Sequence, residues 1–271
     1  MSRFSSDEIA TEVMSRGIVA QISGATVWRW LSEDAIKPWQ HRNWIFPRDP
    51  QFEQKAARVL DLYQGIWQGS ALRSDEFVMS ADEKTSIQAR CRIHRTLPTT
   101  AGQCMRVEHE YERLGALNYI AAWDIRRAKI FGRCEAKTGI QPFDGLVNDV
   151  MTQKPYTSAR RVFWIVDNGS SHRGQAAIQR LQARWPKLVL VHLPVHASWL
   201  NQIEIYFSIL QRKVLTPNDF DSLKNLAQRI IAFQDRYEQT AKPFEWKFTK
   251  DDLSKMMKRL SQQSTPLARA A

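Results

Sequence analysis

Two short runs in the second half of the chain carry residues that could hold a metal ion. The first, residues 162–172, starts with five consecutive apolar residues and continues into Asp167, Asn168 and Gly169. This pattern predicts a buried strand that stops at Asp167. In open α/β sheets, ligands bind beyond the carboxyl ends of strands. The run therefore predicts that the Asp167 carboxylate is fixed at the edge of a cleft.

The second run, residues 193–204, predicts a turn that leads into a helix. Ser198 is the predicted N-cap. Apolar residues then recur at helical spacing and predict a buried stripe, and Glu204 falls at the edge of this stripe. The stripe consists of Leu200, Ile203, Phe207, Leu210 and Val214. If it packs on the sheet that carries Asp167, the two carboxylates converge.

A third carboxylate, Asp82, ends a predicted strand that begins at Glu76. Residues 85–93 alternate well enough to be the antiparallel partner of this strand. Two other acids are rivals. Glu83 is adjacent and points to the opposite face of the strand. Asp124 precedes two arginines, a pattern that favours a turn with a surface salt bridge, so Asp82 ranks above both.

Three carboxylates from separate elements form a donor set for a hard cation. No Cys or His residues occur at metal-ligand spacing, and carboxylate oxygens suit Mg²⁺ or Mn²⁺. Two such ions can stabilise the attacking and leaving oxygens of a phosphodiester. The predicted catalytic and metal-binding residues are Asp82, Asp167 and Glu204.

The polar neighbours of these acids are open to more than one interpretation. His172, five residues after Asp167, could orient a water, contact a phosphate or simply cap a helix. Asn168 and Asn201 could bind substrate or brace the carboxylates. The basic segment 95–113 is equally compatible with a DNA contact and with a solvated surface.

The motifs resemble those of bacterial insertion-sequence transposases of the mariner-related DDE superfamily. The matching residues are Asp82-Glu83-Lys84, Asp167-Asn168 with His172, Leu193-Pro194, and Ser198 through Glu204. The likeness covers roughly residues 20–260. It implies an α/β, ribonuclease H-like mixed sheet flanked by helices. It also implies two Mg²⁺ or Mn²⁺ ions held by the three acids.

Composition favours a polyanionic partner. The 271-residue chain has a formal net charge of +11, and its 43% hydrophobic content supports a real core. Cys91, Cys104 and Cys134 are odd in number and far apart, which argues against a disulfide framework and a zinc site. No signal peptide and no membrane-length apolar stretch occur. We expect a cytoplasmic, nucleoid-associated protein with no membrane partner.

The first 48 residues are predicted to form a small all-α DNA-binding unit. Ser5 and Glu8 have capping-box spacing, and Ser23 is placed to cap a second helix over 25–34. Two such helices predict a helix-turn-helix, although a hairpin packed on the main domain is the alternative. The predicted DNA-binding residues are Thr26, Arg29, Lys37, His41 and Arg42. Relatives usually carry a further helix-turn-helix unit before this one, so we expect either a truncated gene or a misplaced start.

The predicted organisation is a helix-turn-helix unit at 1–48, a catalytic domain at 49–261 and a disordered tail at 262–271. Within the catalytic domain, Asp49 and Pro50 are expected to start a helix. Further strands are predicted at 76–82, 86–93, 117–124, 129–135 and 188–193, and helices at 141–153, 173–185, 221–238 and 251–260.

The resemblance implies a DNA transposase that cleaves strands and transfers them in a metal-dependent reaction. Its partners would be double-stranded DNA, both transposon inverted repeats and target DNA, bound by a homodimer. One alternative is a truncated DNA-binding remnant or regulator without cleavage activity. Another is a ribonuclease H-like nuclease acting on a different nucleic acid, which fits the N-terminal helices poorly.

Overall fold

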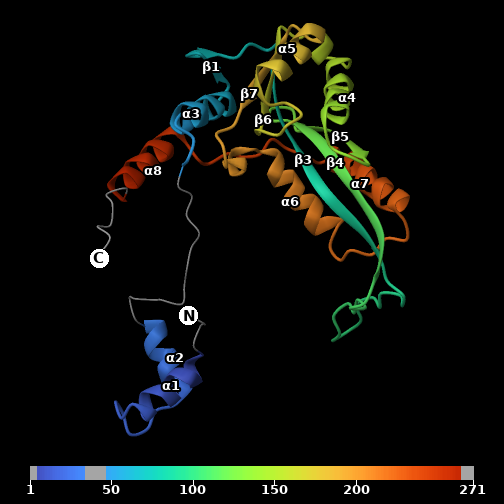
Figure 1. Ribbon diagram of the computed structural model, residues 1–271. Helices are drawn as coiled ribbons and strands as arrows, with labels where there is room; N and C mark the ends of the chain where they lie inside the picture. Colours follow the sequence, from blue (N-terminus) through green and yellow to red (C-terminus); the bar gives the residue numbers. More distant parts are fainter. Residues whose placement is uncertain (1–4, 34–46, 264–271) are drawn as a thin grey trace. The chain divides into compact units, whose positions relative to one another are not determined.

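The computed structural model describes residues 5–33 and 47–263. The chain divides into two compact units, residues 1–46 and 47–271. In the first unit two helices, α1 (Ser6–Ser15) and α2 (Gly24–Glu33), pack on each other (Figure 1). None of the helices within the described ranges is both long and apolar enough to cross a membrane.

Local capping explains where both N-terminal helices begin. The Ser5 hydroxyl accepts a hydrogen bond from the Glu8 amide, and the Glu8 carboxylate accepts one from the Ser5 amide, so the predicted capping box is confirmed. The Ser23 hydroxyl accepts from the Thr26 amide at the start of α2. Each helix is amphipathic and buries one small apolar residue, Ala10 in α1 and Val27 in α2.

The second unit is built on a five-stranded mixed sheet with the order β5-β4-β3-β6-β7. Strand β3 pairs antiparallel with β4 and parallel with β6; β4 pairs antiparallel with β5, and β6 parallel with β7. The strands are β3 (Glu76–Cys91), β4 (Glu112–Asp124), β5 (Lys129–Glu135), β6 (Arg161–Val166) and β7 (Leu188–His192). A separate small hairpin joins β1 (Ile66–Trp67) to β2 (Ser70–Ala71).

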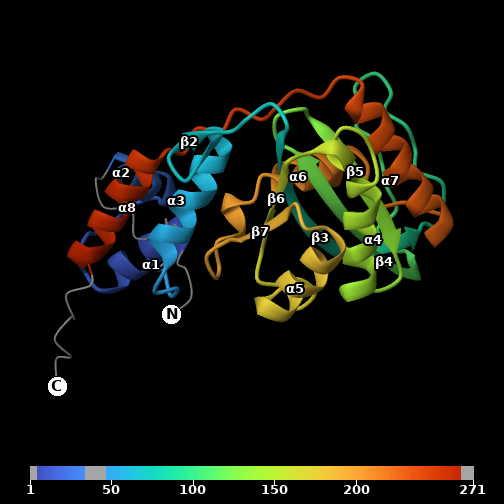
Figure 2. The same ribbon diagram turned by 90° about the horizontal axis from the view of Figure 1, so that it is seen from above.

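Helices cover both faces of this sheet (Figures 1 and 2). Helices α4 (Ile140–Met151) and α5 (Gly174–Arg184) pack on one face, and α6 (Ile203–Lys213) and α7 (Leu223–Glu238) on the other. Helix α3 (Phe52–Tyr63) packs against α8 (Lys250–Gln263), although they lie at opposite ends of the unit's sequence. Two 3-10 turns, η1 (Tyr156–Ser158) and η2 (Ser198–Leu200), complete the unit.

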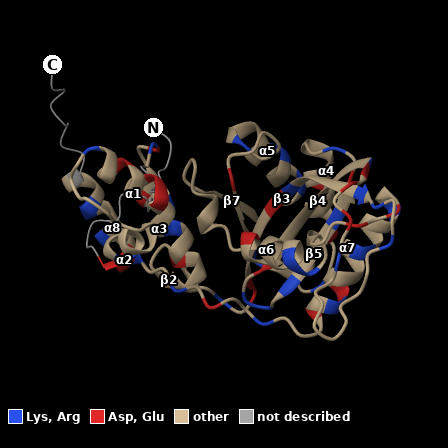
Figure 3. Cartoon of the chain, turned by 90° about the horizontal axis from the view of Figure 1, so that it is seen from below, with Lys and Arg blue, Asp and Glu red and all other residues tan. Residues whose placement is uncertain are grey.

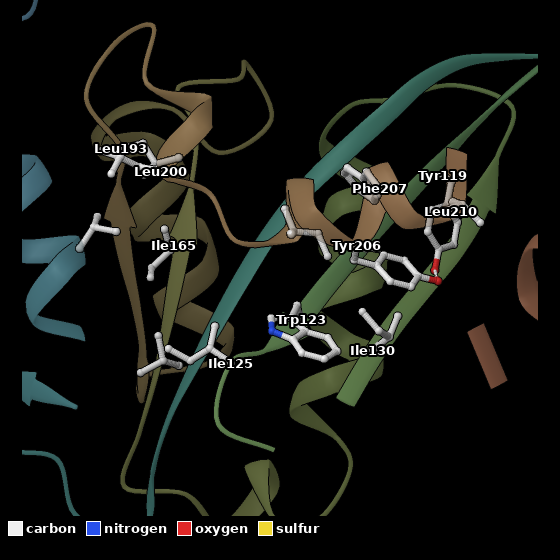
Figure 4. Close-up of a cluster of buried hydrophobic side chains, with 14 of the residues drawn as sticks. Tyr119, Trp123, Ile125, Ile130, Ile165, Leu193, Leu200, Tyr206, Phe207 and Leu210 are labelled. Carbon is white, nitrogen blue, oxygen red and sulfur yellow. Dashed lines mark hydrogen bonds between the residues drawn. The ribbon is translucent and has the colours of Figure 1, made fainter. Parts of the chain in front are cut away.

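Each face of the sheet has its own hydrophobic core. The larger core lies under α6 and α7 and contains the predicted stripe of α6 (Figure 4). There the hydroxyls of Tyr119 and Tyr206 lie 3.3 Å apart, and Trp123 stacks on Phe244 with ring centroids 4.6 Å apart. The smaller core lies under α4 and α5. Burial on both faces explains the continuous apolar run of β6.

The predicted hairpin between residues 76–82 and 85–93 is wrong. Residues 76–91 form one strand, and its antiparallel partner is β4, which starts at Glu112. The pairing register shifts between Lys84 and Ile87, and Ser86 has a positive φ of 55°. Residues 83–86 contain no Gly, Asn or Pro, so the chain makes a bulge here and does not reverse.

Three predicted boundaries also move. Ser198 does not cap α6: it opens the turn η2, and α6 begins at Ile203. Helix α3 begins at Phe52 and not at the predicted Pro50. In the turn before it, Asp49 accepts a hydrogen bond from the Gln51 amide. Helix α8 reaches Gln263, so the first two residues of the predicted disordered tail are helical, and residues 264–271 lie outside the described ranges.

Candidate active site

The topology brings the three predicted acids toward the carboxyl end of β6. In the parallel pair of β3 and β6, the last partners are Ser80 and Ile165. Asp82 and Asp167 each follow two residues later, so they are level on neighbouring strands. Neighbouring strands lie about 4.8 Å apart. Glu204 is in the first turn of α6, which packs on β3.

A polar clasp joins β3 to the start of α6. The buried hydroxyl of Ser80 donates to the Asn201 side-chain oxygen and accepts from the Ile203 amide at 2.9 Å. The Asn201 amide group donates to the Ala81 carbonyl at 3.0 Å and to Asp82 Oδ2 at 3.1 Å. Asn201 therefore braces the Asp82 carboxylate, one of the roles left open by the sequence.

Asp167 is held by a second group of donors. Its Oδ1 accepts from the Gly169 amide at 2.8 Å and lies 2.5 Å from His172 Nε2. The His172 ring is 2% exposed and packs against Phe143. Its Nδ1 lies 2.9 Å from the Ser171 hydroxyl. Both ring nitrogens are engaged, so His172 fixes the orientation of Asp167 and does not cap α5.

The electrostatics match a site for a cation. Burial, together with the charges of Asp167 and Glu204, raises the pKa of Asp82 to about 6, although the hydrogen bond from the Glu83 amide lowers it. Burial and the charge of Asp167 also raise the pKa of Glu204, which Lys84 opposes. By contrast, the hydrogen bond from His172 lowers the pKa of Asp167. The raised pKa of Asp82 and of Glu204 shows that their negative charges are desolvated and not fully compensated by nearby cations or donors.

The donor types fit a divalent hard cation, because all three acids offer carboxylate oxygens beside a half-buried space. Over residues 5–33 and 47–263, however, no three His, Cys, Asp or Glu side chains converge closely enough to form a complete coordination cluster. The acids interact electrostatically, while Asp167 Oδ1 is engaged by His172 and Gly169. Oδ2 of Asp167 is the oxygen that these two donors leave available to an ion.

Neither rival acid takes the place of Asp82. Asp124 is fully buried and accepts from the amides of Arg126 and Arg127 and from the Tyr156 hydroxyl at 2.7 Å. The predicted turn is confirmed, but the predicted surface salt bridge is wrong because the carboxylate faces the core. Glu83 lies on the other side of β3, where its carboxylate accepts from the Ser171 hydroxyl at 3.4 Å.

Basic side chains line the two hollows that flank the acids. One hollow, of about 440 Å³, includes Asp167, Arg173 and His196. The other, of about 310 Å³, includes Glu204, Lys84 and Arg212. Cations next to a carboxylate cluster suit a substrate whose phosphates approach bound metal ions. Lys and Arg residues also occur on most helices and strands of this unit (Figure 3).

The predicted DNA-binding residues are only partly described. Thr26 is half-buried, with its hydroxyl 3.0 Å from that of Ser23, and Arg29 is exposed on α2. Lys37, His41 and Arg42 lie outside the described ranges. Sequence reasoning missed Ser80 and Ser171. A polar residue within the apolar run 77–81 was the available signal for Ser80, whereas no local pattern distinguishes Ser171.

Comparison with protein families decides the affiliation of this unit. The family described as DDE superfamily endonuclease matches residues 78–227, more than half of the chain and all three predicted acids. The chain belongs to the DDE superfamily of endonucleases. A search among curated proteins gave no match.

Solved structures show that this DDE endonuclease has a known fold. The chain is similar to the Mos1 mariner paired end complex with Mn, at 15% identity and a TM-score of 0.55, covering 96% of this chain and 73% of that one. It is also similar to the Mos1 strand transfer complex, at 14% identity and a TM-score of 0.53, covering 96% of this chain and 72% of that one. The predicted ribonuclease H-like α/β fold is confirmed.

Proposed function

We propose that this DDE endonuclease is a transposase that cleaves DNA at the ends of a bacterial insertion sequence and joins them to target DNA. The observation that carries the proposal is the level placement of Asp82 and Asp167 on adjacent strands, with Glu204 on the helix that packs against β3. The neighbours with this fold include Mos1 complexes before cleavage and after strand transfer.

In this proposal Asp82, Asp167 and Glu204 hold two Mg²⁺ or Mn²⁺ ions. Mos1 structures with Mn and with Mg support this choice of ions. A divalent ion bound there supplies Lewis-acid stabilisation of phosphate oxygens and lowers the pKa of a bound water. Asn201 and His172 keep Asp82 and Asp167 in fixed orientations, so that little reorganisation is needed when the substrate binds.

The remaining residues would position DNA. Lys84, Arg173 and Arg212 line the hollows beside the acids and would contact the phosphates that flank the bond to be cut. The N-terminal unit, 1–48, would bind the inverted repeats through Thr26, Arg29, Lys37, His41 and Arg42. Two copies of the chain would pair two ends, acting on nucleoid DNA in the cytoplasm. The domain limits 1–48 and 49–261 belong to the same proposal.

The test is cleavage of a labelled duplex that carries the inverted repeat flanking the gene. Wild type is compared with Asp167→Asn and Glu204→Gln in Mg²⁺, Mn²⁺ and EDTA. We expect cutting only with metal, and a loss of at least about 1,000-fold in either variant, because each removes a metal-binding charge. Both variants should still bind the duplex in EDTA.

Cleavage by Asp167→Asn at the wild-type rate would overturn the assignment of the acids. Binding without cutting under every metal would instead support the alternative function, a DNA-binding remnant or regulator. One observation favours this alternative enough to keep it: the acids do not form a closed coordination cluster over the described residues.

A further inference from the structure

A second concave surface lies next to the candidate active site and is lined by cations. It is a groove of about 540 Å³ between the far end of the β3–β4 pair and the segment after α6. Arg90, Arg92, His109 and Tyr111 line one side, and Thr216 to Asn218 line the other. Neither the family match nor the three acids account for it.

Arginines in and beside this groove surround one half-buried aromatic ring. The guanidinium carbon of Arg90 lies 4.4 Å from the Tyr111 ring centroid, that of Arg92 4.9 Å and that of Arg113 5.9 Å. A hydrogen bond from Arg113 and the charges of Arg90 and Arg92 lower the pKa of Tyr111. The groove wall is therefore a region of positive potential with restricted side-chain freedom.

Carboxylates do not neutralise these guanidinium groups. Across residues 5–33 and 47–263, no ion pair involves Arg90, Arg92 or Arg113. Glu108 also lines the groove, but both of its carboxylate oxygens are engaged by His94. Glu110 and Glu112 are exposed and are not among the lining residues.

Arg92 differs from Arg90 in its role. Its guanidinium donates to the backbone carbonyls of Glu108, His109 and Glu110 and to that of Asn218, so it joins the two sides of the groove. Its Nε is buried and has no hydrogen-bond partner among the residues that the structure describes. Arg90 donates through Nε to Gln88, and its side chain lines the groove. Arg90 is thus the better test of ligand binding.

The groove continues toward the acids. Gln211 lines both the groove and the hollow that contains Glu204, Lys84 and Arg212. Glu204 and Gln211 are seven residues apart on α6, which corresponds to about 10 Å along the helix axis. A duplex advances about 3.4 Å per base pair. A duplex lying along α6 would therefore span the distance from Glu204 to the groove in about three base pairs.

We propose that this groove binds the phosphodiester backbone of duplex DNA about three base pairs from the bond held by the acids. The inference rests on the proposed function, because it takes DNA as the ligand. Guanidinium groups beside the side chains of Tyr111 and Thr216 suit phosphate oxygens, which carry charge but no sequence information. The groove would fix the register of the DNA in the active site without reading bases.

The experiment uses the full chain, a fluorescent 30-base-pair duplex of random sequence and EDTA, with affinity measured by anisotropy from 50 to 300 mM KCl. For Arg90→Gln we expect a salt slope less negative by about one and an affinity lower by about threefold at low salt. Arg90→Lys should keep the slope, because it retains the charge. Arg106→Gln is the matched control: it removes the same charge at an exposed position between β3 and β4 that does not line the groove.

A slope for Arg90→Gln equal to those of wild type and Arg106→Gln would overturn the inference, as would a wild-type chain that binds no duplex. If the groove instead accepts a second copy of the chain, Arg90→Gln would change the sedimentation coefficient and leave the salt slope unaltered. Failure of the proposed function is separate, because it appears as a wild-type chain that binds duplex and does not cut it with metal.

Discussion

At the scale of single residues, Glu204 occupies a position that favours function over stability. Burial and Asp167 raise its pKa, so the folded chain disfavours its ionised form. When folding raises the pKa of a group, the folded chain loses stability as the pH rises from the pKa of that group in the unfolded chain through its pKa in the folded chain. Glu204 in the ion-free chain therefore destabilises the fold at neutral pH and not in acid.

We predict that Glu204→Gln raises the melting temperature of the ion-free chain at pH 7.5 by about 2 °C, the effect of a sub-kilocalorie change in a chain of this size. Below pH 4.5 the two proteins should melt alike, because wild-type Glu204 is then protonated. Calorimetry in EDTA at both pH values measures this. A variant that is less stable than wild type at pH 7.5 would show that Lys84 outweighs the burial of the charge.

His172 is predicted to act on the metal site through Asp167. The imidazole fixes the carboxylate but lies against Phe143 and Ser171 on its other sides. Removal of such an outer partner typically lowers metal affinity 10- to 100-fold. We expect His172→Ala to weaken Mn²⁺ binding by about this factor, as measured by electron paramagnetic resonance of free Mn²⁺.

Asn168→Ala is the matched control for this measurement. The Asn168 amide group donates to the Leu193 carbonyl and does not contact the Asp167 carboxylate. The Asn168→Ala variant should therefore bind Mn²⁺ with the same affinity as wild type. Equal affinity of His172→Ala and Asn168→Ala would assign His172 a purely structural role in the loop.

At the scale of elements, the site depends on how β3 meets α6. Ser80 bridges them, since its hydroxyl satisfies both the Asn201 oxygen and the first amide of α6. A buried amide left without an acceptor costs about 1–3 kcal/mol. The placement of Glu204 relative to Asp82 is therefore tied to a hydrogen bond that contributes nothing to the chemistry itself.

Ser80→Ala should lower the free energy of unfolding by about 1–3 kcal/mol, since the Ile203 amide loses its acceptor. Urea titration followed by tryptophan fluorescence tests this. Ser208→Ala, an exposed position on the same helix, should change stability by less than about 0.5 kcal/mol. A cost for Ser80→Ala no larger than that of Ser208→Ala would mean that the clasp does not hold α6.

At the scale of the whole molecule, the two units have separate interiors. Both hydrophobic cores of the larger unit begin at Phe52 or later and include no residue of α1 or α2. Within residues 5–33, the buried residues are Ala10 and Val27. So small a core contributes little stability by itself, whereas the larger unit is long enough to fold alone.

We predict that residues 47–263 expressed alone melt within about 2 °C of the full chain, because both cores of that unit are retained. The fragment should bind Mn²⁺ normally and lose preference for the inverted repeat over random DNA, if residues 1–48 read the ends. Differential scanning calorimetry and competition binding measure the two properties. A fragment that fails to fold, or that keeps the preference, would contradict this division of roles.

Much of this molecule follows from local sequence patterns. The apolar run 162–166 predicts β6, and the stripe from Leu200 to Val214 predicts the buried face of α6. The Ser5 and Glu8 pair predicts the start of α1. These features depend on side chains a few residues apart, so hydrophobic periodicity and capping suffice to predict them. Asp167 and Glu204 could likewise be selected by their positions at element ends, directly after β6 and in the first turn of α6, whereas Asp82 lies within β3.

Long-range contacts decided the rest. Residues 83–91 pair with β4 and not back on 76–82, because partner choice depends on the sheet and not on alternation alone. The Ser80–Asn201 and Asp167–His172 contacts and the groove around Tyr111 arise only when distant segments pack together. Their energies depend on burial and on geometry within about an ångström, which no local spacing determines. The sequence by itself thus determined which acids are available, and the tertiary structure decided how each is held.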